Sequence, residues 1–327
     1  MIVGLVGLGN LGSAIANLAA NNGHPVIGWE YNSEVVDEIN QAHTNAAYLP
    51  GIDLSPDIEA TTDLSRVWQE TSLVFIALPS VFIERTLAPG RSLVPTSTII
   101  VNMAKGIQAD TGQTSFQVMR QLFPHNRLVM LSGPSIATEF ARGLPTVVVI
   151  ASDHMSNLVP VASVLDNRSF RTRFSADTIG VELGGILKNI YAIGLGLFDG
   201  ADIRSVNFRA AYLTLALEEI TRLGVAMGAM AETFSYLAGL GDLMATSLST
   251  HSHNRHLGEQ LAKGRTLAEI KTEMQVLPEG YNTLKVTLFI AEKMHVSLPL
   301  AKGLWDVING RYLAQQFIDA FIRDFVD

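Results

Sequence analysis

The chain has 327 residues, of which 48% are hydrophobic and 17% are charged, and it contains no cysteine. The absence of cysteine excludes disulfides and thiolate metal sites, and the spacing of histidines and carboxylates predicts no metal site. A net charge of −8 argues against a nucleic-acid-binding protein, whose surface would be basic. No apolar run reaches the roughly 20 residues of a membrane span, and the apolar start lacks the basic segment of a secretion signal. We therefore expect a cytoplasmic protein without membrane insertion.

The first half of the chain alternates short apolar runs with helical patterns, which is typical of a parallel sheet covered by helices on both faces. The predicted strands are 1–8, 25–29, 73–78, 98–102, 128–131 and 146–151, and helices are predicted at 11–22 and 33–43.

Strand-like runs stop near Asp177, and the remaining sequence predicts helices. These are 180–197, 208–227, 231–237, 257–263, 267–272, 283–293, 298–309 and 313–324. A chain of this length allows about two domains. The predicted fold is therefore α/β, with a Rossmann-type doubly wound dinucleotide-binding domain over 1–176 and an all-α substrate and catalytic domain over 177–327.

The strongest local signal is the glycine-rich stretch Gly7-Leu8-Gly9-Asn10-Leu11-Gly12, which fits the pattern G-x-G-x-x-G. It follows a predicted strand and opens a predicted helix, where backbone N–H groups and the positive helix end hold a pyrophosphate. The alternative is an ordinary glycine-rich turn. We predict that Gly7, Gly9, Asn10, Leu11 and Gly12 bind a dinucleotide.

Glu30 and Tyr31 directly follow the second predicted strand, at a position where a carboxylate bonds the ribose hydroxyls of NAD and repels the 2′-phosphate of NADP. No Arg or Lys is near. The sequence therefore favours NAD, with NADP kept as an alternative, unless Glu30 is only a solvated surface carboxylate.

Two lysines are candidates for the chemistry. Lys105 follows the predicted strand 98–102, and ligands of such sheets bind at the carboxyl ends of strands. Lys188 lies in an apolar, glycine-rich helix, where desolvation would lower the pKa of its ammonium toward values useful in proton transfer. The alternative for either lysine is a surface side chain with a buried stem.

Two further stretches are rich in small and polar residues, and we predict both as loops. Ser132-Gly133-Pro134-Ser135 follows a strand, and Gly239-Leu240-Gly241-Asp242 precedes a polar run from Thr246 to Arg255. Such a run binds a phosphate or orients a lysine, and it is equally compatible with a solvated loop.

Several segments together resemble the soluble NAD(P)-dependent glycerol-3-phosphate dehydrogenases, and the bacterial branch most closely. The matching stretches are GLGNLG (7–12), YLPGI (48–52), ATTDL (60–64), AKGI (104–107), LSGPSIATEFARGLPT (131–146), IGVELGGILKNIYAI (179–193), EITRLGVAMGA (219–229), AGLGDL (238–243) and PEGY (278–281). The resemblance implies interconversion of dihydroxyacetone phosphate and sn-glycerol 3-phosphate, and a role in phospholipid biosynthesis.

The resemblance also implies roles for single residues. Lys188 is the implied proton donor and acceptor, oriented by Asp242, with Thr246 close by, and Lys105 is implied to polarise the substrate oxygen. The implied substrate contacts are Lys105, Gly133, Ser135, Asn189, Ser252, His253 and Asn254. The implied cofactor contacts outside the glycine-rich stretch are Glu30, Tyr31, Pro79, Lys105, Ala137, His253 and Glu279.

The chain departs from the family pattern at positions that are usually basic. His253 stands where an Arg usually clamps the substrate phosphate, and basic residues common in relatives are also missing around Glu30, Leu215 and Asn282. One alternative is that Arg255 compensates, and another is that the substrate is a different small hydroxy or keto compound, with or without a phosphate. A non-catalytic dinucleotide sensor on the same fold is a third hypothesis. The apolar segments 190–198 and 208–217 fit a homodimer or a wholly intramolecular core.

Overall fold

The computed structural model describes residues 1–249, 252–274 and 277–324. The chain forms two compact units. Unit 1 comprises residues 1–106 and 113–182, and unit 2 comprises residues 107–112 and 183–327. The predicted boundary after residue 176 lies just before helix α8 (Thr178–Gly200), whereas the units divide within that helix, after Glu182.

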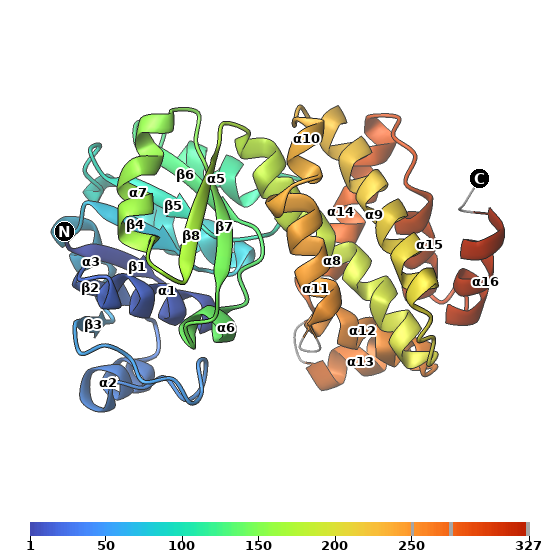
Figure 1. Ribbon diagram of the computed structural model, residues 1–327, viewed down its shortest axis with the longest axis horizontal. Helices are drawn as coiled ribbons and strands as arrows, with labels where there is room; N and C mark the ends of the chain where they lie inside the picture. The colour runs from blue at the N-terminus through green and yellow to red at the C-terminus, as the bar shows by residue number, and fades with distance from the viewer. Residues whose placement is uncertain (250–251, 275–276, 325–327) are drawn as a thin grey trace. The chain divides into compact units, whose positions relative to one another are not determined.

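Unit 1 contains an eight-stranded sheet with the order β3-β2-β1-β4-β5-β6-β7-β8 (Figure 1). Its strands are β1 (Val3–Val6), β2 (Val26–Trp29), β3 (Ile58–Thr61), β4 (Leu73–Ile76), β5 (Ile99–Asn102), β6 (Arg127–Ser132), β7 (Thr146–Ala151) and β8 (Phe170–Ser175). All neighbouring pairs are parallel except β6 and β7. The chain order reverses between β1 and β4, which is the switch point where doubly wound sheets bind ligands.

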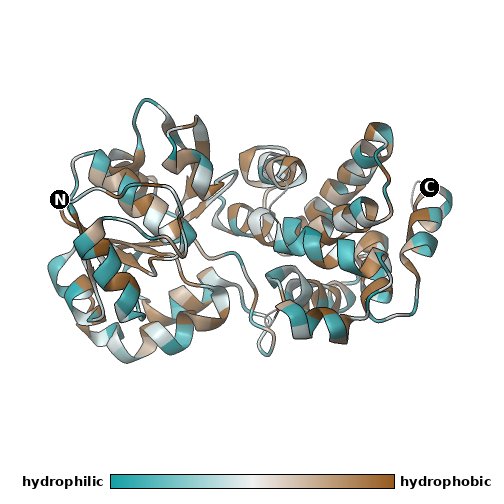
Figure 2. Cartoon of the chain, turned by 90° about the horizontal axis from the view of Figure 1, so that it is seen from below, coloured by the Kyte–Doolittle hydropathy of each residue, from teal (hydrophilic) through white to brown (hydrophobic). Residues whose placement is uncertain are grey.

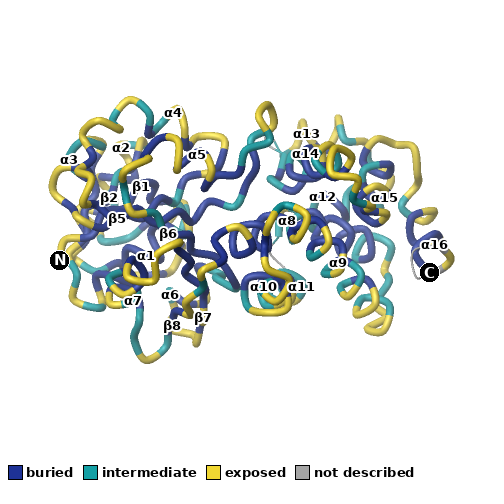
Figure 3. Tube along the Cα trace, turned by 90° about the horizontal axis from the view of Figure 1, so that it is seen from above, coloured by how far each residue is buried: buried dark blue, intermediate teal, exposed yellow. Residues whose placement is uncertain are grey.

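The sheet of unit 1 is covered on both faces, as its continuous apolar strands predict. In β4, Leu73 and Phe75 enter one core, while Val74 and Ile76 enter the core on the opposite face. Figures 2 and 3 show these apolar strands inside unit 1 and the polar, exposed helix faces outside. The helices are α1 (Asn10–Asn21), α2 (Ser33–Ala42), α3 (Leu64–Glu70), α4 (Ile83–Leu87), α5 (Ser115–Leu122), α6 (Ala137–Ala141) and α7 (Leu158–Leu165).

Two strands of unit 1 were not predicted from the sequence. Both lie at the edges of the sheet, and both are partly polar. In β8, Phe170 and Thr172 are buried while Arg171 and Arg173 are exposed. One face of this strand is therefore solvated, and its apolar signal is too weak to stand out beside the buried central strands.

Unit 2 is helical, as predicted. Its helices after α8 are α9 (Val206–Ala226), α10 (Ala231–Phe234), α11 (Asp242–Leu248), α12 (His253–Ala262), α13 (Leu267–Met274), α14 (Glu279–Lys293), α15 (Pro299–Ile308) and α16 (Ala314–Asp324). Glycines let neighbours approach α8 closely. A Cβ at Gly184 would lie 2.3 Å from the Ala238 carbonyl oxygen, and one at Gly196 would lie 1.9 Å from that of Arg255. These glycines therefore set how closely the backbone at Ala238 and Arg255 packs against α8, the helix that carries Lys188.

The prediction of a loop at 239–242 is wrong. Residues Leu237–Gly241 form a π-helical turn, and α11 starts at Asp242. The predicted helix 231–237 is correspondingly shorter, since α10 ends at Phe234. A Cβ at Gly239 would lie 2.2 Å from the Phe234 carbonyl oxygen, so this glycine serves close packing inside a helical turn and not loop flexibility.

Helix α8 is long and apolar enough, by length and composition, to cross a membrane. However, 89% of its apolar window is buried inside the protein. It also carries Glu182 and Lys188, which a lipid-exposed helix would not tolerate at low cost. The burial of α8 is that of a core helix.

A buried carboxyl group in unit 2 makes stability depend on pH. Glu219 accepts hydrogen bonds from the Tyr191 hydroxyl at 2.8 Å and from the N–H groups of Leu300 and Ala301 at 2.6 and 3.1 Å. Burial raises the pKa of Glu219 from its ordinary value of 4.5 to about 7. Between these values the folded state keeps a proton that the unfolded state has released, so stability falls as pH rises.

We expect Glu219→Gln to reduce this fall, measured as the melting temperature between pH 5 and 8. The fall should not vanish, because burial also raises the pKa of Glu182 in unit 1 to about 7. If the melting temperature of the variant falls with pH as steeply as that of the wild type, Glu219 does not titrate between pH 5 and 8.

Candidate active site

The glycine-rich turn in unit 1 joins β1 to α1 and leaves an open approach to the helix N-terminus. Gly7 has φ +95°, which favours glycine, and a Cβ at Gly12 would lie 1.8 Å from the Gly7 carbonyl oxygen. In contrast, a Cβ at Gly9 would meet nothing within 4 Å. Gly9 is also the N-cap of α1, and no side chain caps this helix. The turn therefore leaves room beside Gly9, at the N-terminus of α1.

Two buried side chains that sequence reasoning missed hold this turn in place. The Ser13 hydroxyl donates to the Leu8 carbonyl at 2.8 Å. The Asn45 amide donates to the same carbonyl at 2.8 Å and to the Ser13 hydroxyl at 2.9 Å. Asn45 lies 37 residues from Leu8, so only its place beside the YLPGI stretch could have suggested it.

Glu30 is buried, so the interpretation as a solvated surface carboxylate is wrong. Its carboxylate accepts hydrogen bonds from the Leu8 N–H and the Asn32 N–H, both at 3.2 Å. It therefore lies at the carboxyl end of β2, directly against the glycine-rich turn. Tyr31 beside it is exposed, and its hydrogen bond to the Tyr48 hydroxyl raises the pKa of Tyr48.

The glycine-rich turn and Glu30 fit a dinucleotide. Gly9 offers space for close approach of phosphates, and the twelve-residue helix α1 directs its uncapped N-terminus there. Asn10 and Leu11 are the first residues of that helix. A carboxylate at the end of β2 suits ribose hydroxyls. These residues of unit 1 would hold the cofactor.

Lys105, Gly133 and Ser135 come together at the carboxyl edge of the sheet, after β5 and β6. The Lys105 ammonium donates to the Gly133 carbonyl at 3.2 Å, and the Ser135 hydroxyl donates to the same oxygen at 3.1 Å. Gly133 has φ +102°, which turns the chain after β6. At the same edge, Pro79 follows β4, and Ala137 is the first residue of α6.

In unit 2, Lys188 on α8 forms an ion pair with Asp242, the first residue of α11. The side chains are 13% and 2% exposed, respectively. The Thr246 hydroxyl, one turn further along α11, donates to the Asp242 carbonyl at 2.8 Å. Because a buried ammonium needs a partner, this pair orients Lys188 while its exposed part remains accessible.

Asn254 connects three helices of unit 2. Its amide nitrogen donates to the Asn189 side-chain oxygen on α8 at 3.1 Å, and its amide oxygen accepts from the Gly280 N–H on α14 at 2.9 Å. Glu279 is the first residue of α14. These contacts bring the predicted residues Asn189, Asn254 and Glu279 to one place beside Lys188.

Ser252 and His253 begin α12. The Ser252 hydroxyl caps the helix by accepting from the Arg255 N–H at 3.3 Å, and His253 is exposed. The predicted role of Arg255 as a substitute phosphate clamp is not supported, because its Nε and both Nη atoms donate to Asp199, Ser247 and Ser249. Within the part of the chain that the structure describes, His253 and His256 are the other basic side chains in the first turn of α12.

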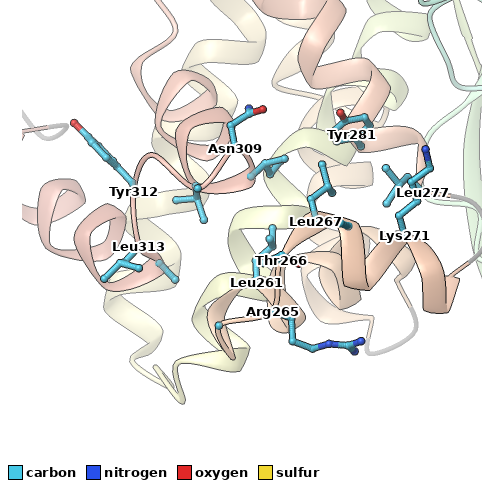
Figure 4. Close-up of a pocket in the computed structure, with 16 residues that line it drawn as sticks. Leu261, Arg265, Thr266, Leu267, Lys271, Leu277, Tyr281, Asn309, Tyr312 and Leu313 are labelled. Carbon is cyan, nitrogen blue, oxygen red and sulfur yellow. The ribbon is translucent and has the colours of Figure 1, made fainter.

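Unit 2 also contains a cavity of about 680 Å³ between α12, α13, α14 and α15 (Figure 4). Tyr281, Leu267 and Asn309 are among the residues that line it. None of the predicted site residues does. The cavity is thus separate from the Lys188 and Asp242 pair.

Comparisons with known proteins cover nearly the whole chain. The N-terminal domain model of the NAD-dependent glycerol-3-phosphate dehydrogenases matches residues 2–158, and the C-terminal model matches residues 177–319. The chain is 37% identical over 309 residues to a glycerol-3-phosphate dehydrogenase (NAD(P)+) of Geobacter sp. (strain M21), covering 94% of this chain and 92% of that protein. It is 39% identical to the corresponding protein of Pseudomonas syringae pv. syringae (strain B728a), covering 98% and 94%.

A solved structure is also similar. The crystal structure of glycerol-3-phosphate dehydrogenase from Coxiella burnetii has a TM-score of 0.91 and 30% sequence identity, and the match covers 98% of each chain.

Proposed function

The chain belongs to the NAD(P)-dependent glycerol-3-phosphate dehydrogenases, which interconvert dihydroxyacetone phosphate and sn-glycerol 3-phosphate, and we propose that Lys188 is its proton donor and acceptor. The observation that supports this role is the buried ion pair between Lys188 and Asp242. The alternatives of another substrate or a non-catalytic sensor receive no support from the comparisons.

The bound nicotinamide cofactor supplies the hydride for reduction of the C2 carbonyl of dihydroxyacetone phosphate. Lys188, as an ammonium, donates a proton to the carbonyl oxygen as that oxygen becomes negative, so the alcohol forms without a free alkoxide. Asp242 keeps the Lys188 side chain oriented before and after the proton transfer. In the oxidative direction, the Lys188 amine accepts the alcohol proton.

We propose that the other predicted residues keep the roles that the resemblance implies. Lys105 stabilises the developing negative charge by a charge-assisted contact with the substrate oxygen. Gly133, Ser135, Asn189, Ser252, His253 and Asn254 contact the substrate, and His253 bonds the phosphate in place of the usual Arg. The residues that hold the cofactor are Gly7, Gly9, Asn10, Leu11, Gly12, Glu30, Tyr31, Pro79, Lys105, Ala137, His253 and Glu279.

The direct test is incubation of the protein with NADH and dihydroxyacetone phosphate, with the product identified by a stereospecific assay. Formation of sn-glycerol 3-phosphate in proportion to NADH consumed supports the proposal. NADH consumption with a different product, or none, contradicts it.

We propose a preference for NAD(H) over NADP(H), supported by the buried carboxylate of Glu30 beside the glycine-rich turn. Glu30→Gln removes the negative charge and keeps one acceptor for the surrounding N–H groups. It should reduce the ratio of kcat/KM for NADH to that for NADPH by about tenfold, since repulsion of a 2′-phosphate is lost. A ratio unchanged by the substitution, in a variant of normal melting temperature, would remove this role from Glu30.

We also propose that the protein is a cytoplasmic homodimer. The segment 190–198, which was one candidate interface, is buried within unit 2. Tyr236, Leu240 and Met244 support association instead, because they are exposed apolar side chains at four-residue spacing. Light scattering should give twice the 35.4 kDa of one chain, and Met244→Lys should shift the mass toward one chain.

A further inference from the structure

Arg255 on α12 makes contacts that the proposed chemistry leaves unexplained. Its Nε and Nη2 atoms donate to one oxygen of Asp199 on α8, at 2.9 and 2.7 Å. Its Nη1 atom donates to the Ser247 carbonyl at 3.0 Å and to the Ser249 carbonyl. One guanidinium therefore joins α8, α12 and the last turn of α11.

The carbonyls that Arg255 binds are ones that a helix leaves unsatisfied. The final carbonyls of an α-helix have no intrahelical partner, and a cation near a helix C-terminus is favourable. Arg255 satisfies two of these groups, and its side chain is only 14% exposed. The close packing at Gly196, against the Arg255 backbone, sets the distance at which this is possible.

Helix α11 is consequently attached to α8 at both ends. Asp242 pairs with Lys188 at its start, and Arg255 links its end to Asp199. Because α11 has only seven residues, release of its end would let the whole helix tilt and would change the orientation of Asp242. We propose that Arg255 is a positioning residue that holds α11 so that Asp242 orients Lys188, an inference that rests on the proposed role of Lys188.

The start of α12 has separate attachments. Asn254 binds Asn189 and Gly280, and the cap from Ser252 uses only the backbone N–H of residue 255. Loss of the Arg255 guanidinium should therefore disturb α11 and leave the start of α12, with Ser252 and His253, in place. Replacement of Arg255 should therefore lower kcat and leave the KM for dihydroxyacetone phosphate unchanged.

Arg209 on α9 supplies a matched control. It donates to the other oxygen of Asp199 at 2.7 Å and to the Ile203 carbonyl at 2.9 and 3.1 Å, so it holds the connection between α8 and α9. Arg209→Lys and Arg255→Lys thus weaken equivalent guanidinium contacts on the same carboxylate. Of these two arginines, Arg255 is the one that donates a hydrogen bond to α11.

The experiment compares Arg255→Lys, Arg209→Lys and Lys188→Ala in steady-state reduction of dihydroxyacetone phosphate. We expect Arg255→Lys to lower kcat by about 10- to 100-fold with KM within about twofold, since a small misplacement of a catalytic group costs rate. Arg209→Lys should keep both constants.

A raised KM with normal kcat would mean that Arg255 binds the phosphate, and an equal loss of kcat in Arg209→Lys would mean that Asp199 acts on the whole fold. Either result, or an unchanged Arg255→Lys enzyme, overturns the inference. If Arg255→Lys does not fold, Asp199→Asn carries the test when it is compared with Arg209→Lys, because it loosens both Arg255 and Arg209 from α8 whereas Arg209→Lys loosens only Arg209. Turnover by Lys188→Ala would refute the proposed acid–base role itself, whereas an inactive Lys188→Ala beside a normal Arg255→Lys refutes only the inference.

Discussion

Replacement of Lys188 by Ala should lower kcat for the reduction of dihydroxyacetone phosphate by about 10³-fold, because a positioned general acid contributes roughly 10²- to 10⁴-fold. Binding of NADH, followed by fluorescence titration, should not change, since Lys188 is not among the residues predicted to hold the nucleotide. Lys302→Ala is the matched control, because Lys302 is also paired with an aspartate of unit 2, Asp306. Its kcat should equal that of the wild type.

Loss of stability must be separated from loss of chemistry in this experiment. The Asp242 side chain is 2% exposed, so removal of Lys188 alone leaves a buried carboxylate without its lysine partner, at a cost of about 3–5 kcal/mol. The double variant Lys188→Met with Asp242→Asn removes both charges and should recover much of the melting temperature without activity. A double variant that turns over at more than about a tenth of the wild-type rate would contradict the assigned role.

Substitution of Gly9 should separate cofactor binding from folding. A Cβ at this position meets nothing within 4 Å, so Gly9→Ala should fold with an unchanged melting temperature. It places a methyl group where the phosphates approach, and we expect the Kd for NADH to rise about 10- to 100-fold, equivalent to the loss of one or two charged hydrogen bonds.

Gly12→Ala provides the contrast. Its Cβ would lie 1.8 Å from the Gly7 carbonyl oxygen, so this variant should lose stability as well as NADH affinity. Calorimetric titration and thermal unfolding of both variants check the two predictions together. Wild-type affinity in Gly9→Ala would place the pyrophosphate away from this turn.

Much of unit 1 could be predicted because its central strands are buried on both faces and read as continuous apolar runs. The glycine-rich turn was equally predictable, since Gly7 and Gly12 are required locally by a positive φ and by a 1.8 Å approach. The edge strand β8 could not be predicted, because exposed Arg171 and Arg173 alternate with its buried residues.

The acid–base pair was predicted only in part. The apolar surroundings of Lys188 singled it out, whereas Asp242 lies 54 residues away and was assigned from the family resemblance. The ion pair of Arg255 was not predicted, because its partner Asp199 lies 56 residues earlier, and a basic residue two positions after His253 suggested a phosphate contact as one alternative. The pairing of each basic side chain with a particular carboxylate depends on how the helices pack. Local sequence patterns do not encode this pairing.

The most direct test of this account is kcat/KM with NADH for dihydroxyacetone phosphate and for unphosphorylated dihydroxyacetone. This comparison tests both the identity of the substrate and whether the site still binds its phosphate with His253 in place of the usual Arg. We expect the phosphorylated substrate to be preferred by at least about 100-fold, since the loss of a charge-assisted phosphate contact costs roughly 1.5–3 kcal/mol and more than one contact is assigned. Equal values for the two compounds would contradict the account.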